Sequence, residues 1–304
     1  MANELVSLSN ELASAVERTA AGLVAVQARP RIGTSGVIWR PNRILTASEG
    51  IRFEEGIRVL LPDGRNAEAR LRGRDAGTDL ALVEADTAGF SPLDFASDAA
   101  LKVGHLVLAV GRTASTGPIA SFGIISGVSG EWKTWRGGRL NPFVRLDISV
   151  YATSSGGAVV DPEGRVIGLV SIGLSRSSVL AVTRTTIDQV AQRLENQGYV
   201  SRGFLGIALQ PVALPEELKK RLQLEQNHGI MLLGLEPDGP AALGGLILGD
   251  ILLTAGGRTL ASADDLADLL DRTAAGDTVN FRVLRAGAVR EAEIRIGERP
   301  RRRK

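Results

Sequence analysis

Residues 147–161 read Asp147-Ile-Ser-Val-Tyr-Ala-Thr-Ser-Ser-Gly-Gly-Ala-Val-Val-Asp161. Within this stretch, the turn 149–156 lies between two short apolar runs, 143–148 and 157–160. Apolar runs of this length, bounded by turn residues, are typical of β-strands. Similar runs follow one another from about residue 22 to residue 183, separated by Gly, Pro, Asn and Asp. The first two thirds of the chain are therefore predicted to form an all-β sandwich or barrel.

The pattern changes after residue 202, where helical and strand patterns alternate. Short apolar runs predict strands, and Pro215 and Ser262 each stand where a helix is expected to begin. About 100 residues of mixed α and β structure predict a compact second domain. We expect four parts along the chain: an N-terminal helix over 1–20, a first domain over 21–198, a second domain over 199–297 and a tail over 298–304.

The composition limits the chemistry. The chain has 304 residues, which predicts about two domains. It has no cysteine, which excludes a disulfide scaffold, a zinc–thiolate site and a thiol nucleophile. Only two histidines occur, His105 and His228, so a histidine cluster is excluded as well. We expect no metal ion and no cofactor.

The positive charge is concentrated at the C-terminal end. The formal net charge is +2, from 36 basic and 34 acidic residues. The last six residues, 299–304, hold five of the basic ones, and without them the net charge is −3. The folded part therefore offers no basic patch for nucleic acid. The tail is expected to be a solvated end, with weak contact to an acidic partner as the alternative.

The first residues predict an amphipathic helix. Leu5, Leu8, Leu12 and Val16 recur every three or four residues, and no basic segment followed by an apolar core precedes them. No apolar run reaches the length of a membrane span. On this basis we expect a cytoplasmic protein, and a periplasmic one only if the start is processed.

Five segments, taken together, resemble the HtrA/DegP-like family. Residues 36–49, 77–83 and 147–161 are similar to the segments that carry that family's catalytic histidine, aspartate and serine, in this order. Residues 202–207 and 245–260 are similar to its PDZ domain. The resemblance implies a mainly β fold: a trypsin-like double six-stranded β-barrel (21–198) followed by a smaller α+β PDZ domain (199–297).

The resemblance places Ser155 at the nucleophile position and Asp79 at the orienting carboxylate. The base position holds Glu49 instead of histidine. A serine hydroxyl needs a base within hydrogen-bond reach, and the ordinary pKa of glutamate, about 4.3, is low for this task near neutral pH. The Glu49–Asp79 pair is expected to share a proton if the two side chains are close, which would raise one pKa. His105 is interpreted as a structural residue of a strand.

The turn before the nucleophile also departs from the family pattern. Ala152 and Thr153 stand where the family has Pro and Gly, and Ala158 replaces a proline. The amides of Thr153 and Ser155 belong to the expected oxyanion turn, where a β-branched residue at positive φ would be strained. These changes favour an inactive site, in which Asp79 and Ser155 remain as hydrogen-bonding groups of the core.

The second domain is expected to bind peptide C-termini by adding them as a strand to a sheet edge. Phe204, Leu205 and Gly206 are the expected carboxylate loop, and Ile207 and Leu209 continue the edge strand. The facing wall is expected to consist of Leu266, Leu269 and Leu270, with a purely structural role for these leucines as the alternative. Few charges line this floor, so we expect an apolar C-terminal ligand residue.

Two features bear on assembly. Trp132 and Trp135 lie in a polar stretch, where they could anchor an interface or fold back as a lid. The family commonly assembles as trimers, so a homo-oligomer is expected. The apolar face of the N-terminal helix could contribute to it or dock on its own barrel.

Three functions remain open. The favoured hypothesis is a pseudoprotease that binds polypeptide C-termini or unfolded segments as a scaffold or adaptor. The alternative is an active serine endopeptidase of protein quality control that uses Ser155 with a non-standard base. A chaperone-like holdase without chemistry is the third.

Overall fold

The structure is a computed structural model that describes residues 2–29, 33–200, 203–273 and 275–298. The chain divides into two compact units, Met1–Val200 and Ser201–Lys304. Each unit is described by itself below. Arg202 and the basic tail 299–304, both of which entered the expectations above, lie outside the described residues.

The first unit begins with a closed six-stranded barrel. The strand order is β1-β2-β3-β6-β5-β4, and β4 pairs with β1 to close it. Leucine, isoleucine and valine point into the barrel at alternate positions, such as Val24, Ile38 and Ile44, and all three are fully buried. Its strands are β1 Leu23–Gln27, β2 Thr34–Arg40, β3 Arg43–Ala47, β4 Ile57–Leu60, β5 Asn66–Asp75 and β6 Leu80–Ala85.

A second closed barrel follows, in the order β11-β14-β13-β12-β7-β8, with β8 paired to β11. Between β8 and β11 the chain forms a short hairpin, β9 Trp132–Lys133 and β10 Arg139–Leu140. The strands of the barrel are β7 Leu106–Thr113, β8 Gly117–Ser129, β11 Phe143–Asp147, β12 Ala158–Val160, β13 Val166–Ser171 and β14 Val179–Thr183. Three short 3-10 turns complete the unit: η1 Ser48–Gly50, η2 Asp98–Ala100 and η3 Ala152–Ser154.

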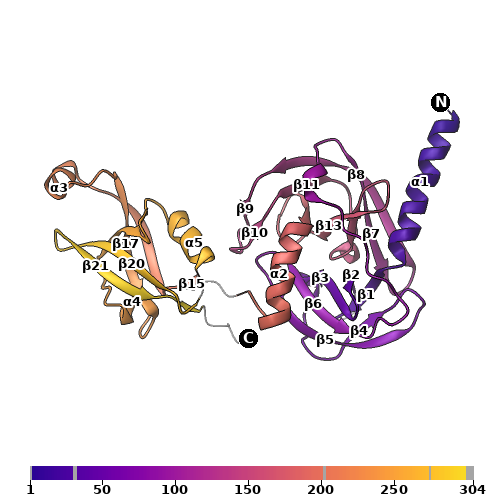
Figure 1. The fold of residues 1–304 in the computed structure, drawn as a ribbon, viewed down its shortest axis with the longest axis horizontal. Coiled ribbons are helices and arrows are strands. Elements are labelled where there is room, and N and C mark those ends of the chain that lie inside the picture. The colour runs from indigo at the N-terminus through magenta and orange to yellow at the C-terminus, as the bar shows by residue number, and fades with distance from the viewer. Residues whose placement is uncertain (1, 30–32, 201–202, 274, 299–304) are drawn as a thin grey trace. The chain divides into compact units, whose positions relative to one another are not determined.

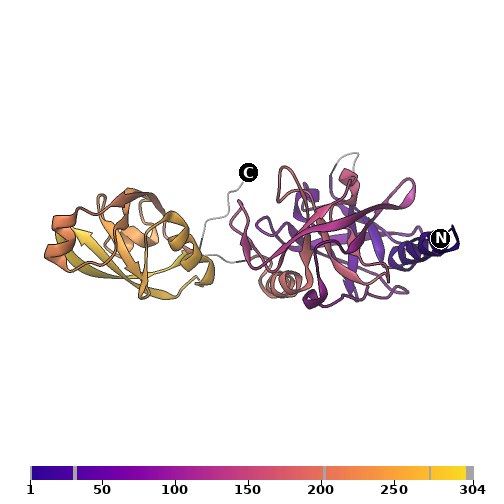
Figure 2. The same cartoon turned by 90° about the horizontal axis from the view of Figure 1, so that it is seen from above.

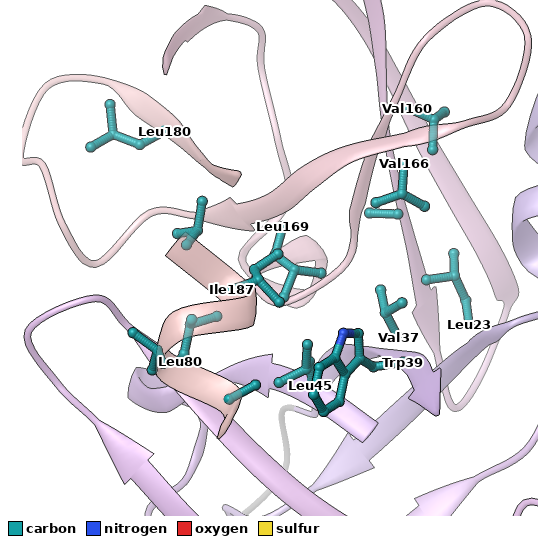
Figure 3. Packing of buried hydrophobic residues seen from close by; sticks show 14 of the residues in the cluster. Leu23, Val37, Trp39, Leu45, Leu80, Val160, Val166, Leu169, Leu180 and Ile187 are labelled. Atoms are coloured by element: carbon teal, nitrogen blue, oxygen red, sulfur yellow. The ribbon is translucent and has the colours of Figure 1, made fainter. Parts of the chain in front are cut away.

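One apolar cluster joins the two barrels. Figure 3 shows Leu45 and Leu80 of the first barrel with Val160 and Leu169 of the second, and Ile187 beside them. Ile187 belongs to α2, Arg184–Gln197, which ends at Gly198 in the left-handed conformation. Because this cluster contains buried residues of both barrels, it fixes how the loops at their junction meet. The active-site segments described below come from these loops.

Helix α1, Ala2–Ala20, packs on the barrels with its C-terminal half only. Ala15 is fully buried, and Leu12 and Val16 pack against the shared cluster. Leu5 is 70% exposed, and the first turns of the helix extend away from the barrels in both views (Figures 1 and 2). The helix therefore docks on its own barrel at one end and leaves its other end uncovered by the described residues.

The second unit is a small α+β domain built on the sheet order β16-β17-β18-β20-β21, with β19 paired to β18. Strand β16 lies at the end of this order. The elements are β15 Gly203–Phe204, β16 Ile207–Ala213, α3 Glu216–Leu222, β17 His228–Leu235, α4 Pro240–Leu243, β18 Ile251–Ala255, β19 Arg258–Thr259, α5 Ala263–Arg272, β20 Thr278–Arg285, β21 Ala288–Arg295 and β22 Gly297–Glu298.

The predicted fold class is confirmed: two closed six-stranded barrels are followed by a smaller α+β domain. Among the described residues, no helix has the length and apolar character needed to cross a membrane.

Candidate active site

Three segments at the junction of the barrels carry the expected triad. Glu49 lies in η1, directly after β3, and Asp79 lies directly before β6. Since β3 pairs with β6, with Ala47 opposite Leu80, the two acids are neighbours. Ser155 follows η3 on the second barrel. The structure thus brings together the three residues that the sequence pattern singled out.

The three residues form a chain of hydrogen bonds. Ser155 Oγ donates to Glu49 Oε1 at 2.8 Å. The amide of Glu49 donates to Asp79 Oδ1 at 2.9 Å, and Ser171 Oγ donates to Asp79 Oδ2 at 2.7 Å. Asp79 therefore holds the main chain of Glu49, while the side chain of Glu49 reaches Ser155, the expected nucleophile. This arrangement lets a carboxylate accept the serine proton directly.

Burial dominates the electrostatics of Asp79, which is only 1% exposed. Burial raises the pKa of Asp79, the hydrogen bond from Ser171 lowers it, and the negative charge of Glu49 raises it again. The amide of Glu49 and the charge of Arg136 lower it. The result is a pKa of about 6, against an ordinary value of 3.8. Asp79 thus keeps its proton to a higher pH than an ordinary aspartate does.

Gly173 leaves room for the carboxylate of Glu49. A Cβ atom placed on Gly173 would lie 2.5 Å from Glu49 Oε2 and 3.3 Å from Asp79 Oδ2. At the first distance one of the two groups must move, so a side chain at position 173 would displace the carboxylate of Glu49. Both carboxylates therefore face the same segment, Ser171–Gly173, which begins with the last residue of β13.

Strand β2 of the first barrel holds a turn of the second, residues 152–156, which carries Ser155 and is called the nucleophile turn here. The Ser35 amide donates to the Ser155 carbonyl at 3.0 Å, and the Thr34 hydroxyl donates to the same oxygen at 2.5 Å. Ser35 Oγ donates to the Thr153 carbonyl at 2.6 Å. Two carbonyls of the turn are thus fixed by buried side chains and a buried amide, which sets the direction of its peptide planes.

The strain expected at Thr153 is absent, so that prediction is wrong. Thr153 lies in the 3-10 turn η3, and the non-glycine residues of the described part with positive φ do not include it. The residue that takes the left-handed conformation is Gly156, at φ 78°. A threonine is therefore compatible with the backbone of this turn. Asp79 is the triad-position residue with positive φ, at 57°.

Sequence reasoning missed four supporting residues: Thr34, Ser35, Ser171 and Gly173. None of them stands in a pattern that distinguishes it from an ordinary strand or turn residue. The only signal was position, because hydroxyl residues in otherwise apolar strand runs must find partners when they are buried. In the chain, Ser171 lies more than 90 residues from its partner Asp79, and Ser35 lies more than 110 residues from its partner Thr153.

Neither histidine belongs to the candidate site. His105 is exposed and directly precedes β7, whereas His228 begins β17 of the second unit. Trp132 folds back on Phe143, with ring centroids 5.0 Å apart, while Trp135 is 64% exposed beneath the guanidinium of Arg136. The hairpin that carries them docks on the Asp79 segment, because Thr134 Oγ1 donates to the Gly77 carbonyl at 2.7 Å.

In the second unit, the expected peptide-binding residues surround the start of β16. Phe204 is in β15, Leu205 is buried and Gly206 has φ 71°. Ile207 and Leu209 lie on β16, which pairs with β17 on one side. On α5, which contacts β16, Leu266 is buried in the core, whereas Leu269 and Leu270 are partly buried against the same cluster. For Leu266 the geometry is that of a core residue.

Comparison with known proteins matches both units. Residues 34–169 match the model of a trypsin-like peptidase domain, and residues 203–296 match that of a PDZ domain. Among solved structures, an HtrA-type protease, AlgW with a decapeptide, is similar with a TM-score of 0.75 and 27% identity, covering 95% of this chain and 99% of that one. A serine endoprotease from Yersinia pestis is similar with a TM-score of 0.76 and 29% identity, covering 95% and 98%.

Curated relatives point the same way. A probable periplasmic serine endoprotease, DegP-like, of Halomonas elongata is 32% identical over 277 residues, which are 90% of this chain and 57% of the relative. The protein of the same name from Bartonella henselae is 30% identical over 276 residues, 88% and 52%. The chain thus spans about half the length of the curated relatives it matches.

Fold and site together define a trypsin-like peptidase domain joined to a PDZ domain. The chain belongs to the HtrA/DegP-like family. The expectation of a cytoplasmic protein is contradicted, because these relatives are named periplasmic proteins. The error came from interpreting the N-terminal residues as evidence about the compartment.

Proposed function

We propose that this protein is an HtrA-type serine endoprotease of the periplasm, in which Glu49 serves as the base for Ser155. The observation that carries the proposal is the 2.8 Å hydrogen bond from Ser155 Oγ to Glu49 Oε1. The names of the relatives support cleavage of polypeptides over a scaffold without chemistry. Protein quality control is the role we assign to it.

The proposed reaction is acyl transfer. As Ser155 Oγ bonds to the carbonyl carbon of the scissile peptide, its proton passes to Glu49 Oε1. Glu49 then gives this proton to the leaving amine, the C–N bond breaks and an acyl-enzyme remains. Water attacks the ester with Glu49 again as proton acceptor, and the proton returns to Ser155 as the acid product leaves. Atoms and protons balance without a cofactor.

Two features make a carboxylate workable here. The hydroxyl is already within hydrogen-bond distance of the carboxylate, so no rearrangement is needed before proton transfer. The amides of Thr153 and Ser155 are the proposed donors to the oxyanion, and the bonds from strand β2 to the turn fix its peptide planes. Asp79 is a positioning residue, since it binds the amide of Glu49.

The PDZ domain is proposed to capture chain ends. Strand β16 lies at the end of the sheet order, so its second edge can accept an added peptide strand. The loop 204–206 is the proposed carboxylate cradle, and an apolar C-terminal residue is the expected ligand. Replacing Ile207 by proline would remove an amide from this edge strand and is expected to abolish binding of a fluorescent peptide with a free C-terminus. The amidated form of that peptide is the control.

Assembly is also a proposal. The first turns of α1 expose Leu5 and Val6, which the described part of the chain does not cover. We propose that they contribute to a homo-oligomer, a trimer by resemblance to the family. Leu5→Asp should then lower the molar mass measured by light scattering during gel filtration, whereas Asn10→Asp, on the exposed face of the same helix, should not.

The decisive experiment is labelling with a fluorophosphonate probe together with turnover of casein. Wild-type protein is expected to be labelled and active, Ser155→Ala to be neither, and Ser129→Ala, an exposed serine of the same barrel, to behave as wild type. Glu49→Gln keeps a hydrogen-bond acceptor at Ser155 but removes the base, so the rate should fall about 10²–10⁴-fold. Absence of labelling in wild type that also lacks casein turnover would refute the proposal.

One observation favours a second candidate, a pseudoprotease that only binds polypeptide. A carboxylate occupies the base position, and the ordinary pKa of its type is lower than that of imidazole. On this hypothesis Ser155→Ala would bind unfolded segments as well as wild type and would suppress client aggregation in a light-scattering assay. Wild type would then also leave casein intact, and this result separates the scaffold or chaperone from the protease.

A further inference from the structure

A polar pocket lies beside the candidate active site without including it. Its volume is about 600 Å³, and none of Glu49, Asp79 and Ser155 lines it. Its walls come from β8, from the end of β11 with residues 148–150, and from residues 172–179, which lead from β13 into β14. Residues 148–150 lead into the nucleophile turn, and residues 172–178 follow Ser171. The pocket is thus bounded by the segment that leads to Ser155 and by the segment that follows Ser171, the hydrogen-bond partner of Asp79.

The lining is rich in hydrogen-bond donors. Two arginines, Arg145 and Arg176, contribute guanidinium groups, and Asp147 is the single acidic residue of the lining. Their charges sum to +1. Five hydroxyl groups add further donors: Ser126, Ser149, Ser175, Ser177 and Ser178. A guanidinium with hydroxyls around it is the donor set that proteins use for phosphate and carboxylate groups.

The two arginines are placed differently. Arg145 is held by Ser126: its Nε donates to Ser126 Oγ at 3.2 Å, and its Nη2 donates to the Ser126 carbonyl at 3.4 Å. These bonds leave further N–H groups of its five for a ligand. Arg176 is exposed and has no hydrogen bond or ion pair with any other residue in the described ranges. One guanidinium is therefore positioned in advance, and the other is free to close on an anion.

We propose that this pocket binds an oxyanion, as a free phosphate or as the phosphate of a phosphorylated polypeptide. Both sources present the same oxygen acceptors. The proposal concerns binding alone and holds whether or not Ser155 cleaves peptides. An anion held between residues 148–150 and 172–178 would tie these segments together, and their amides would exchange more slowly with deuterium.

The test is calorimetric titration of the full chain carrying Ser155→Ala, so that cleavage plays no part. The probes are inorganic phosphate at constant ionic strength, a short phosphoserine peptide and its unphosphorylated form. Both peptides are amidated at the C-terminus, which denies the PDZ domain a carboxylate. Hydrogen exchange of residues 172–178 is followed with and without each probe.

Removing one guanidinium, in Arg176→Ala or Arg145→Ala, is expected to weaken binding about tenfold, and removing both to abolish it. Arg176→Lys should recover part of the affinity, while Arg193→Ala, an exposed arginine of α2, should bind as the parent does. Binding of phosphate alone identifies a free anion as the source, and binding restricted to the phosphopeptide identifies a polypeptide. No binding of either probe, or equal binding by the double variant, would overturn the proposal.

Discussion

Replacing Asp79 by asparagine should change how the stability of the first domain depends on pH. The pKa of Asp79 is about 6 in the folded protein and 3.8 ordinarily, a difference of about 2. Each pKa unit corresponds to 1.36 kcal/mol, so protonation of this one group contributes about 3 kcal/mol. Because the folded pKa is the higher one, this contribution is complete below pH 3.8. It is lost as the pH rises through about 6.

Asparagine carries no charge at any of these pH values and keeps an acceptor for the Glu49 amide. The free energy of unfolding of Asp79→Asn, minus that of wild type, should therefore rise by about 3 kcal/mol between pH 3.8 and about pH 7. Urea unfolding followed by tryptophan fluorescence measures this quantity for the right domain. All three tryptophans, Trp39, Trp132 and Trp135, lie in the first unit.

Asp147→Asn, which removes an exposed carboxylate from the second barrel of the same unit, controls for the loss of one charge. If the curves of wild type and Asp79→Asn run parallel over this range, the burial argument for Asp79 is refuted. A difference that falls with rising pH would contradict its sign.

Three further results are expected. The rate of Ser155 labelling in Glu49→His, divided by that in wild type, should rise between pH 5 and pH 8. The reason is that the ordinary pKa of imidazole, about 6.5, exceeds that of a carboxylic acid. A ratio that does not change with pH would exclude residue 49 as the base. Gly173→Ala should slow labelling about tenfold or more by displacing Glu49, while Gly127→Ala, where the added Cβ meets its nearest neighbour at 3.5 Å, should not. In the PDZ domain, Asp250 is buried and receives two 2.7 Å hydrogen bonds from Arg285, whose side chain is partly exposed. Asp250→Ala should therefore destabilise this domain by about 1.5–3 kcal/mol, measured by circular dichroism in urea.

The same ion pair makes the PDZ domain sensitive to acid. Burial raises the pKa of Asp250, but the hydrogen bond from Arg285, the amide of Ile247 and the charge of Arg285 together hold it below its ordinary value. A lowered pKa means that stability is present above pH 3.8 and is lost as the pH falls below it. Unfolding of wild type and Asp250→Asn should therefore converge in acid; curves that stay separate would argue against this reading.

The fold was predictable because its signal is local. Short apolar runs bounded by turn residues predicted the strands, and the order of the motifs around Glu49, Asp79 and Ser155 predicted which segments meet. What the pattern could not supply is the geometry of the nucleophile turn. Thr153 looked unfavourable for a turn at positive φ, yet the chain places Gly156 in that conformation and Thr153 in a 3-10 turn.

The contacts that support the candidate site could not be predicted from the sequence either. Ser35 is an ordinary strand serine until the second barrel docks and brings the Thr153 carbonyl within 2.6 Å. Gly173 is an ordinary turn glycine until Glu49 lies where its Cβ would be. Such contacts join segments far apart in the chain, and periodicity carries no information about them.

The bonds from Thr34 and Ser35 to the nucleophile turn have a bearing on biogenesis. Their donors belong to one barrel and their acceptors to the other, so a chain that has completed only its first barrel during synthesis has the donors without the turn. The turn that carries Ser155 acquires these supports only when both barrels have closed and met. Under the proposed function, a newly made chain would therefore stay without protease activity until the domain is whole.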